Sequence, residues 1–97
     1  MNIMIVNGPN LNFLGIREPE VYGKESYEDL YKLIKGYAKE KQFKFKMYQS
    51  NYEGDIIELL QYAHLKQFDA VILNPGAYTH YSYAIYDAIK SISIPTI

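Results

Sequence analysis

Residues 3–9 read IMIVNGP, and this stretch decides the fold. Four consecutive apolar residues closed by a chain breaker are typical of a short strand that is covered on both faces, as in the centre of a parallel sheet. Residues 70–76 repeat the pattern as AVILNPG. The two stretches together predict a parallel sheet with central strands at residues 3–6 and 70–73.

The intervening segments alternate between helix and strand patterns. Residues 26–41 predict a helix, because Ser26 and Asp29 resemble a capping box and apolar side chains then recur at helical spacing. Residues 43–48 alternate apolar and polar side chains, which predicts a strand with one solvated face. A further helix is marked by apolar residues from Ile56 to Ala63 and is expected to end before Asp69. Another helix is expected at residues 82–91, and the beginning of a fourth strand at 94–97.

Strands that alternate with helices predict an α/β fold built on a parallel sheet. We expect residues 1–97 to form a single domain, a flavodoxin-like three-layer sandwich with strand order 2-1-3-4. A fifth strand belongs to that arrangement and is missing, so we expect a domain that is incomplete at its C-terminus and weakly stable. Ligands of such sheets bind beyond the carboxyl ends of the strands, where the loops at 7–25, 49–54 and 74–81 meet.

Composition excludes several classes of function. The formal net charge is −1 with both signs interspersed, which does not favour nucleic acid or an anionic membrane as a partner. The absence of cysteine excludes disulfides and thiolate sites. No apolar stretch is long enough to cross a bilayer, and we expect a cytoplasmic protein. His64 and His80 lack a nearby acidic pair, so no metal site is expected.

The first loop contains an Arg and a Tyr five residues apart, Arg17 and Tyr22. A guanidinium near a phenol favours the phenolate, and a phenolate of lowered pKa is a competent base for a carbon acid. Alternatively, Arg17 pairs with Glu18 or Glu20 on the surface and Tyr22 packs the loop. From the residues of the loop alone, the surface ion pair is the favoured interpretation.

The third loop has an amide at the end of a strand, Asn74, and a histidine just before a helix, His80. Backbone amides at that helix start can face an anionic or polyhydroxylated ligand. Asp87 lies one helical turn further on, where it either reaches the same pocket or is solvated. A turn with a solvated histidine is the alternative interpretation.

Three motifs, taken in order, resemble those of the type II 3-dehydroquinate dehydratases. The first is GPNLN at 8–12 with REP at 17–19 and YG at 22–23, the second is QSN at 49–51 with EG at 53–54, and the third is NPGAYTH at 74–80. The resemblance spans the whole chain. It implies a flavodoxin-like fold, trimers assembled into a dodecamer, no metal or organic cofactor, and elimination of water from 3-dehydroquinate to give 3-dehydroshikimate in the shikimate pathway.

The resemblance also implies roles for individual residues. Tyr22 would be the base that takes a proton from the carbon next to the ketone, and Arg17 would lower the pKa of its phenol. Asn10 would hold a water molecule that stabilises the enolate. The ring hydroxyls would be held by three side chains, Asn74, His80 and Asp87.

The chain departs from the family pattern at Tyr52, where His is common, and at Tyr86, where Arg is common. The family continues the strand that begins at residue 94 into a Glu-x-His segment that supplies the general acid. Without that acid, a factor of roughly 10² to 10⁴ in rate is at stake. The alternative to an active enzyme is a catalytically dead relative that keeps only substrate-binding or assembly surfaces. A flavin-binding module is not favoured, because the first loop lacks a Ser/Thr-rich phosphate cradle.

Overall fold

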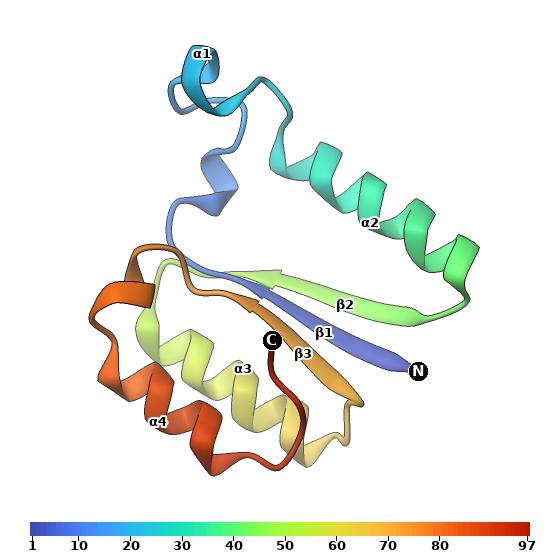
Figure 1. Cartoon of the computed structure of the whole chain (residues 1–97), viewed down its shortest axis with the longest axis vertical. Coiled ribbons are helices and arrows are strands. Elements are labelled where there is room, and N and C mark those ends of the chain that lie inside the picture. The colour runs from blue at the N-terminus through green and yellow to red at the C-terminus, as the bar shows by residue number, and fades with distance from the viewer.

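A three-stranded parallel sheet forms the centre of the computed structural model, which describes residues 1–20, 23–79 and 81–97. The strands are β1 (Asn2–Asn7), β2 (Lys44–Gln49) and β3 (Ala70–Asn74), in the order β2-β1-β3. Figure 1 shows α2 on one face of this sheet and α3 with α4 on the other. The α/β class and the parallel sheet predicted from the sequence are therefore confirmed.

The three long helices are α2 (Tyr27–Lys41), α3 (Glu53–Leu65) and α4 (Tyr83–Ser91). They match the predicted helices, although α3 begins three residues before the predicted start, because Glu53 and Asp55 suit the positive end of a helix. Among the described helices, none combines the length and the apolar character that a membrane crossing requires.

The loops contain short helices that the sequence did not predict. These are η1 (Leu11–Phe13), α1 (Pro19–Tyr22) and η2 (Gly76–His80). Pro19 occupies the first helical position, where its missing N–H has no partner to lose. Asn10 precedes η1 in the left-handed conformation, with φ of 68°, which Asn tolerates better than most residues. Helices this short leave no periodic pattern from which to predict them.

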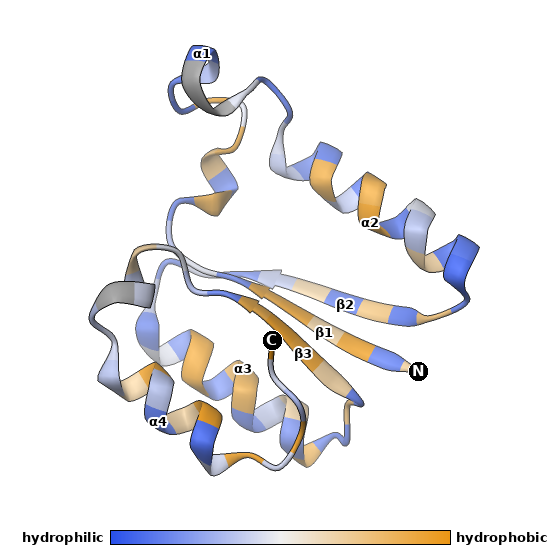
Figure 2. Cartoon of the chain, viewed as in Figure 1, coloured by the Kyte–Doolittle hydropathy of each residue, from blue (hydrophilic) through white to orange (hydrophobic). Residues whose placement is uncertain are grey.

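The main core lies between the sheet and the pair α3 and α4. Apolar residues run along β1 and β3, whereas β2 alternates between hydrophobic and hydrophilic residues (Figure 2). The side chains with no exposed surface are Met4, Val6, Ile56, Leu60, Ala63 and Val71. The pairing register sets Met4 beside Val71 and Val6 beside Leu73, so that one face of both strands meets the helices. Burial of these residues supplies most of the hydrophobic stabilisation.

The opposite face of the sheet is covered only in part. Ala38 of α2 is buried, and Ile5 of β1 is 7% exposed. Ile72, the neighbour of Ile5 on β3, is 42% exposed, and Ile97 is 82% exposed. Apolar surface is therefore exposed at the β3 edge of this face and at the C-terminal residue.

The C-terminal segment runs parallel to β3 but does not form a full strand. Val71 and Thr96 make an isolated parallel bridge. The N–H of Val71 donates to the Pro95 carbonyl at 2.9 Å, and that of Leu73 donates to the Ile97 carbonyl at 2.8 Å. The predicted fourth strand thus appears as a bridge on the β3 edge of the sheet.

The capping box at the start of α2 is confirmed. The Ser26 side chain accepts a hydrogen bond from the Asp29 N–H at 3.0 Å, and the Ser26 N–H donates to the Asp29 carboxylate at 2.9 Å. These hydrogen bonds with Ser26, chiefly the one from its backbone N–H, hold the pKa of the Asp29 carboxyl below its ordinary value. The box fixes where α2 begins and so where the first loop must end.

The substitution Asp29→Asn is expected to change how stability depends on pH. Because the pKa of Asp29 is lower in the folded chain than in the unfolded one, its carboxylate stabilises the fold above the unfolded pKa of about 4. That contribution is lost as the pH falls through the folded pKa. Urea unfolding should therefore find the unsubstituted chain more stable than the variant at neutral pH, with the difference shrinking below about pH 4. A difference that stays constant in acid would contradict this assignment.

Candidate active site

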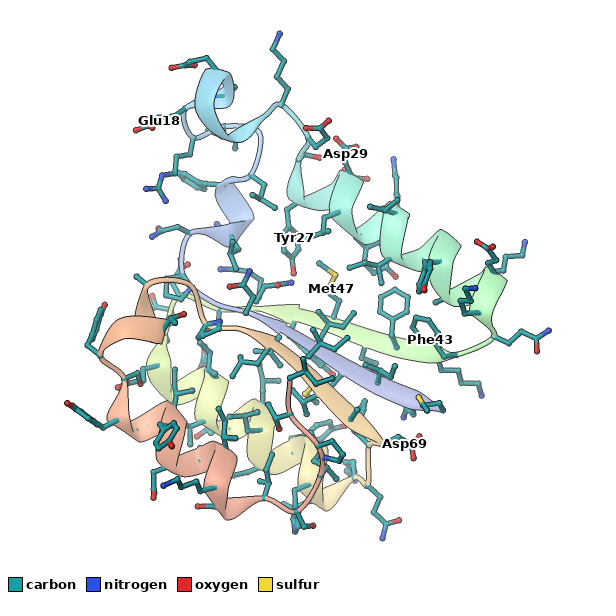
Figure 3. The ribbon with its side chains drawn as sticks, viewed as in Figure 1. Glu18, Tyr27, Asp29, Phe43, Met47 and Asp69 are labelled. Carbon is teal, nitrogen blue, oxygen red and sulfur yellow. The ribbon has the colours of Figure 1, made fainter. Side chains whose placement is uncertain are left out.

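Amide side chains lie at the carboxyl ends of all three strands. Asn7 at the end of β1 is paired in register with Gln49 of β2 and with Asn74 of β3. Asn7 is 6% exposed, and its Nδ2 donates to the Tyr27 hydroxyl at 3.3 Å. Figure 3 shows Tyr27 pointing from α2 toward the sheet. The three loops therefore leave a row of polar groups at the edge where ligands of such sheets bind.

A pocket of about 590 Å³ opens at this edge between the first and third loops. Its lining residues are Pro9, Asn10, Leu11, Phe13, Leu14, Arg17, Gly76 and Ala77. A volume of this size suits a small molecule. The pocket combines an apolar wall with one amide and one guanidinium, so it can hold a small polar ligand that carries carbonyl or hydroxyl oxygens.

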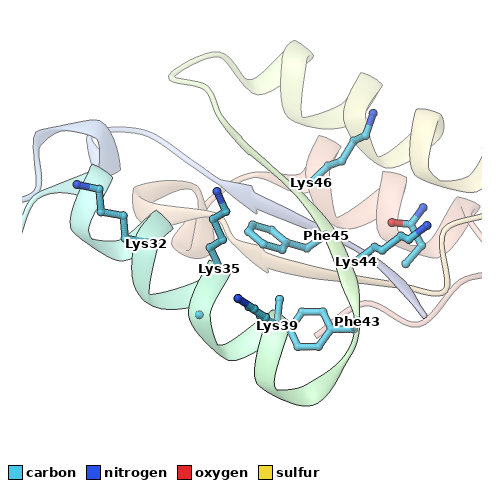
Figure 4. Close-up of a pocket in the computed structure, with 10 residues that line it drawn as sticks. Lys32, Lys35, Lys39, Phe43, Lys44, Phe45 and Lys46 are labelled. Carbon is cyan, nitrogen blue, oxygen red and sulfur yellow. The ribbon is translucent and has the colours of Figure 1, made fainter.

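A larger hollow of about 800 Å³ lies between α2 and the edge strand β2. Phe45 of β2 and Phe43, which precedes the strand, project toward α2, whose lysines lie on the same side, whereas Lys44 and Lys46 of β2 point away from that helix (Figure 4). Its lining offers cationic side chains and aromatic rings but no carboxylate to pair with them. Lysines beside an edge strand also oppose pairing with another chain. We therefore take the smaller pocket at the strand ends as the candidate site.

The first and third loops are in backbone contact beneath this pocket. The Gly8 N–H donates to the Asn74 carbonyl at 2.8 Å. A Cβ atom on Gly8 would lie 2.6 Å from the Pro75 carbonyl oxygen, closer than real Cβ atoms approach backbone. The pocket therefore depends on glycine at residue 8, because only glycine lets the two loops approach this closely.

The substitution Gly8→Ala is expected to destabilise the chain by about 1 to 3 kcal/mol, because the added methyl group forces the two loops apart. Gly36→Ala is the matched control: Gly36 lies in α2 with open space around it, and the same change should stabilise the helix by up to about 1 kcal/mol. Urea unfolding monitored by circular dichroism measures both. Equal effects at the two positions would rule out the close approach as the cause.

The predicted second loop, residues 49–54, contacts this site through Gln49 and Asn51, which the sequence analysis placed in a family motif without assigning them a role. Gln49 Nε2 donates to the Gly8 carbonyl and to Asn51 Oδ1, each at 3.0 Å. Asn51 Oδ1 also accepts from the Asn10 N–H at 3.1 Å. The signal was present in the sequence, because two amides follow the edge strand toward the same sheet edge.

The structure brings some of the predicted site residues together. Asn10 and Arg17 line the pocket. Asn74 is not among the lining residues, but its Oδ1 accepts from the N–H of the lining residue Gly76 at 3.2 Å. Asp87 is exposed on α4 and is not among the residues that line the pocket. The predictions for Tyr22 and His80 fall outside the described residues.

Other side chains singled out from the sequence lie away from the pocket. His64 is partly exposed at the end of α3, where its Nδ1 accepts from the backbone N–H of Ser93 at 3.3 Å. Tyr52 and Tyr86, the two departures from the family pattern, are 72% and 60% exposed. Within residues 1–20, 23–79 and 81–97, no group of three His, Cys, Asp or Glu side chains is arranged to hold a metal ion.

Comparison with known proteins identifies the family. The family model described as dehydroquinase class II matches residues 1–97. The 3-dehydroquinate dehydratase of Clostridium acetobutylicum is 58% identical over 100% of this chain and 67% of its own length. That of Caldicellulosiruptor bescii is 56% identical over 98% of the chain and 66% of its own length.

Solved structures give the same result. The type II dehydroquinase of Butyrivibrio crossotus superposes with a TM-score of 0.95 at 54% identity, covering 99% of this chain and 67% of that protein. The type II dehydroquinase of Propionibacterium acnes has a TM-score of 0.90 at 33% identity, covering 98% of this chain and 65% of that protein. The chain thus spans about two thirds of the length of the relatives that it matches. It belongs to the class II dehydroquinase family.

Proposed function

We propose that the protein containing this chain is a type II 3-dehydroquinate dehydratase, a hydro-lyase that removes water from 3-dehydroquinate to give 3-dehydroshikimate. The observation that carries the proposal is the presence of Asn10 and Arg17 in one pocket at the carboxyl edge of the sheet, in a chain of the dehydroquinase family. Curated relatives named 3-dehydroquinate dehydratase are 50% to 58% identical to it, which supports the same chemistry here.

The proposed reaction begins with proton abstraction. Tyr22, as phenolate, takes the proton from the carbon next to the ketone, and the carbon–hydrogen electron pair forms an enolate. Arg17 lowers the pKa of that phenol, because a nearby cation favours the phenolate. Asn10 holds a water molecule that donates to the enolate oxygen. The enolate then expels the ring hydroxyl, which leaves as water with a proton from a general acid, and the product is the conjugated enone.

Substrate orientation is the proposed role of Asn74, His80 and Asp87, which would bind the ring hydroxyls. Asn74 Oδ1 already accepts from the Gly76 N–H, so its amide group remains the donor toward a ligand. The pocket wall of Leu11, Phe13 and Leu14 would exclude water from the carbanion-like centre. Because the residues of such a site act together, the loss of one affects both orientation and chemistry.

We also propose a complete fold and an oligomeric state for the protein that contains this chain. Residues 94–97 would be the start of a fourth strand in a flavodoxin-like sandwich of order 2-1-3-4, completed by a fifth strand. Trimers would assemble into a dodecamer in the cytoplasm, where the enzyme would serve the shikimate pathway without a metal or organic cofactor. Analytical ultracentrifugation of the protein that contains this chain tests the assembly, because it measures the mass of the oligomer.

The test of the function is the dehydration of 3-dehydroquinate, followed through the ultraviolet absorbance of the conjugated product. It is made on the 97-residue chain and on a fusion of residues 1–97 to the third of the Clostridium acetobutylicum dehydratase that the match does not cover. Turnover by the fusion supports the dehydratase. A folded fusion that binds the product but does not turn over substrate would indicate the catalytically dead relative instead.

A further inference from the structure

Asn51 lies between the first and third loops and contacts both. Its side-chain oxygen accepts from the Asn10 N–H in the first loop at 3.1 Å. Its backbone carbonyl accepts from the Tyr78 hydroxyl in the third loop at 3.2 Å. Asn10 lines the pocket, and Tyr78 follows the pocket residues Gly76 and Ala77. One residue of the second loop is therefore bonded to both walls of the site.

The orientation of the Asn51 amide follows from its partners. The Asn10 N–H and Gln49 Nε2 are both donors, so the atom that faces them must be an acceptor. A carboxylate at this position accepts from both in the same way, whereas a methyl group accepts from neither. The chemistry of the site therefore distinguishes Asp from Ala as a replacement for Asn51.

Gln49 extends this hydrogen-bond network to the first loop. Its Nε2 donates at once to Asn51 Oδ1 and to the Gly8 carbonyl, each at 3.0 Å. Gly8 in turn donates its N–H to the Asn74 carbonyl. The hydrogen bonds therefore run from the third loop through the first loop to the second, and Asn51 is where they reach Asn10.

The backbone of Asn10 needs such support. Its φ of 68° is a left-handed conformation, which costs a non-glycine residue free energy unless its surroundings hold it. The Asn10 carbonyl accepts from the Phe13 N–H at 3.0 Å and so begins the turn that carries Phe13 and Leu14 into the pocket. The hydrogen bond that the Asn10 N–H donates to Asn51 Oδ1 thus holds the Asn10 backbone where the pocket wall begins.

We propose that Asn51 is a positioning residue: its side-chain oxygen holds the backbone of Asn10 in the left-handed conformation, and its carbonyl secures the third loop across the pocket. The inference rests on the proposed function in one respect: the orientation of Asn10 matters for catalysis only if the protein is a dehydratase. The hydrogen-bond arrangement itself does not depend on that function. The two are therefore tested by separate measurements.

Amide hydrogen exchange in the 97-residue chain tests the positioning without any activity. In Asn51→Ala the Asn10 amide should exchange about tenfold faster than in the unsubstituted chain, because its acceptor is gone. In Asn51→Asp it should exchange as in the unsubstituted chain. The Val6 amide in the centre of the sheet should be unaffected in all three proteins, which shows that the fold is intact. Equal Asn10 exchange in the Ala and Asp variants would overturn the proposal.

Turnover by the fusion tests the link to catalysis. Asn51→Ala should lower kcat by about tenfold or more with a smaller change in KM, because a displaced Asn10 acts on the intermediate rather than on substrate binding. Asn51→Asp should restore kcat. Gln61→Ala, which removes an exposed amide from α3, is the control and should leave both parameters unchanged. A kcat unaffected by Asn51→Ala would refute a role of Asn51 in positioning Asn10 for catalysis. A folded but inactive unsubstituted fusion would refute the proposed dehydratase activity. In that case the hydrogen-exchange result alone would decide whether Asn51 positions Asn10.

Discussion

Replacing Tyr22 by Phe should lower the rate of 3-dehydroquinate turnover by a factor of about 10² to 10⁴. The substitution removes the hydroxyl of the proposed general base and keeps the ring. The change deletes a single hydroxyl oxygen, so packing is nearly conserved. The loss should appear in kcat and kcat/KM alike, because the proton transfer contributes only in the transition state. The measurement is the rate of enone formation by the fusion, with the Tyr22→Phe and unsubstituted proteins compared at equal concentration.

Tyr52→Phe is the matched control for this experiment. It removes the same atom from a tyrosine that is 72% exposed and does not line the pocket. Its kcat should equal that of the unsubstituted fusion. Similar losses in the two variants would point to a general effect of hydroxyl removal, and full activity in Tyr22→Phe would rule out this residue as the base.

Leu60→Ala should destabilise the chain by about 2 to 5 kcal/mol. Leu60 lies in the middle of α3 with no exposed surface, in the core shared by the sheet, α3 and α4. The substitution removes buried carbon atoms and leaves a cavity that the neighbouring strands cannot close. Urea unfolding by circular dichroism should show a large decrease in the midpoint.

Leu65→Ala supplies the control on the same helix. Leu65 is 76% exposed, so the change should alter the free energy of unfolding by less than about 0.5 kcal/mol. If Leu60→Ala leaves no folded population, Ile56→Val extends the measurement, because it removes one methylene group from an equally buried side chain and should cost about 1 kcal/mol. Comparable effects at residues 60 and 65 would contradict the position of the core.

Part of the candidate site could be predicted from the sequence. The apolar runs of β1 and β3 end in breakers, and parallel strands place their carboxyl ends at one edge, so the convergence of the three loops was predictable. The contacts of Asn10 with the second loop and of Gly8 with the third confirm that convergence. The roles proposed for Arg17 and Tyr22 came from the family resemblance, because the loop residues alone favour a surface ion pair of Arg17 with Glu18 or Glu20.

The sequence by itself determined the α/β class, the three long helices and the edge at which the site lies, because these follow from local periodicity, capping and breakers. Only the tertiary structure decided which groups meet there. The close approach that requires Gly8 and the hydrogen bonds of Asn51 with Asn10 and Tyr78 join residues 27 or more positions apart. The short helices of the loops depend on backbone conformations that leave no periodic signal. Contacts between distant segments depend on how the strands pack, and packing is a property of the whole fold.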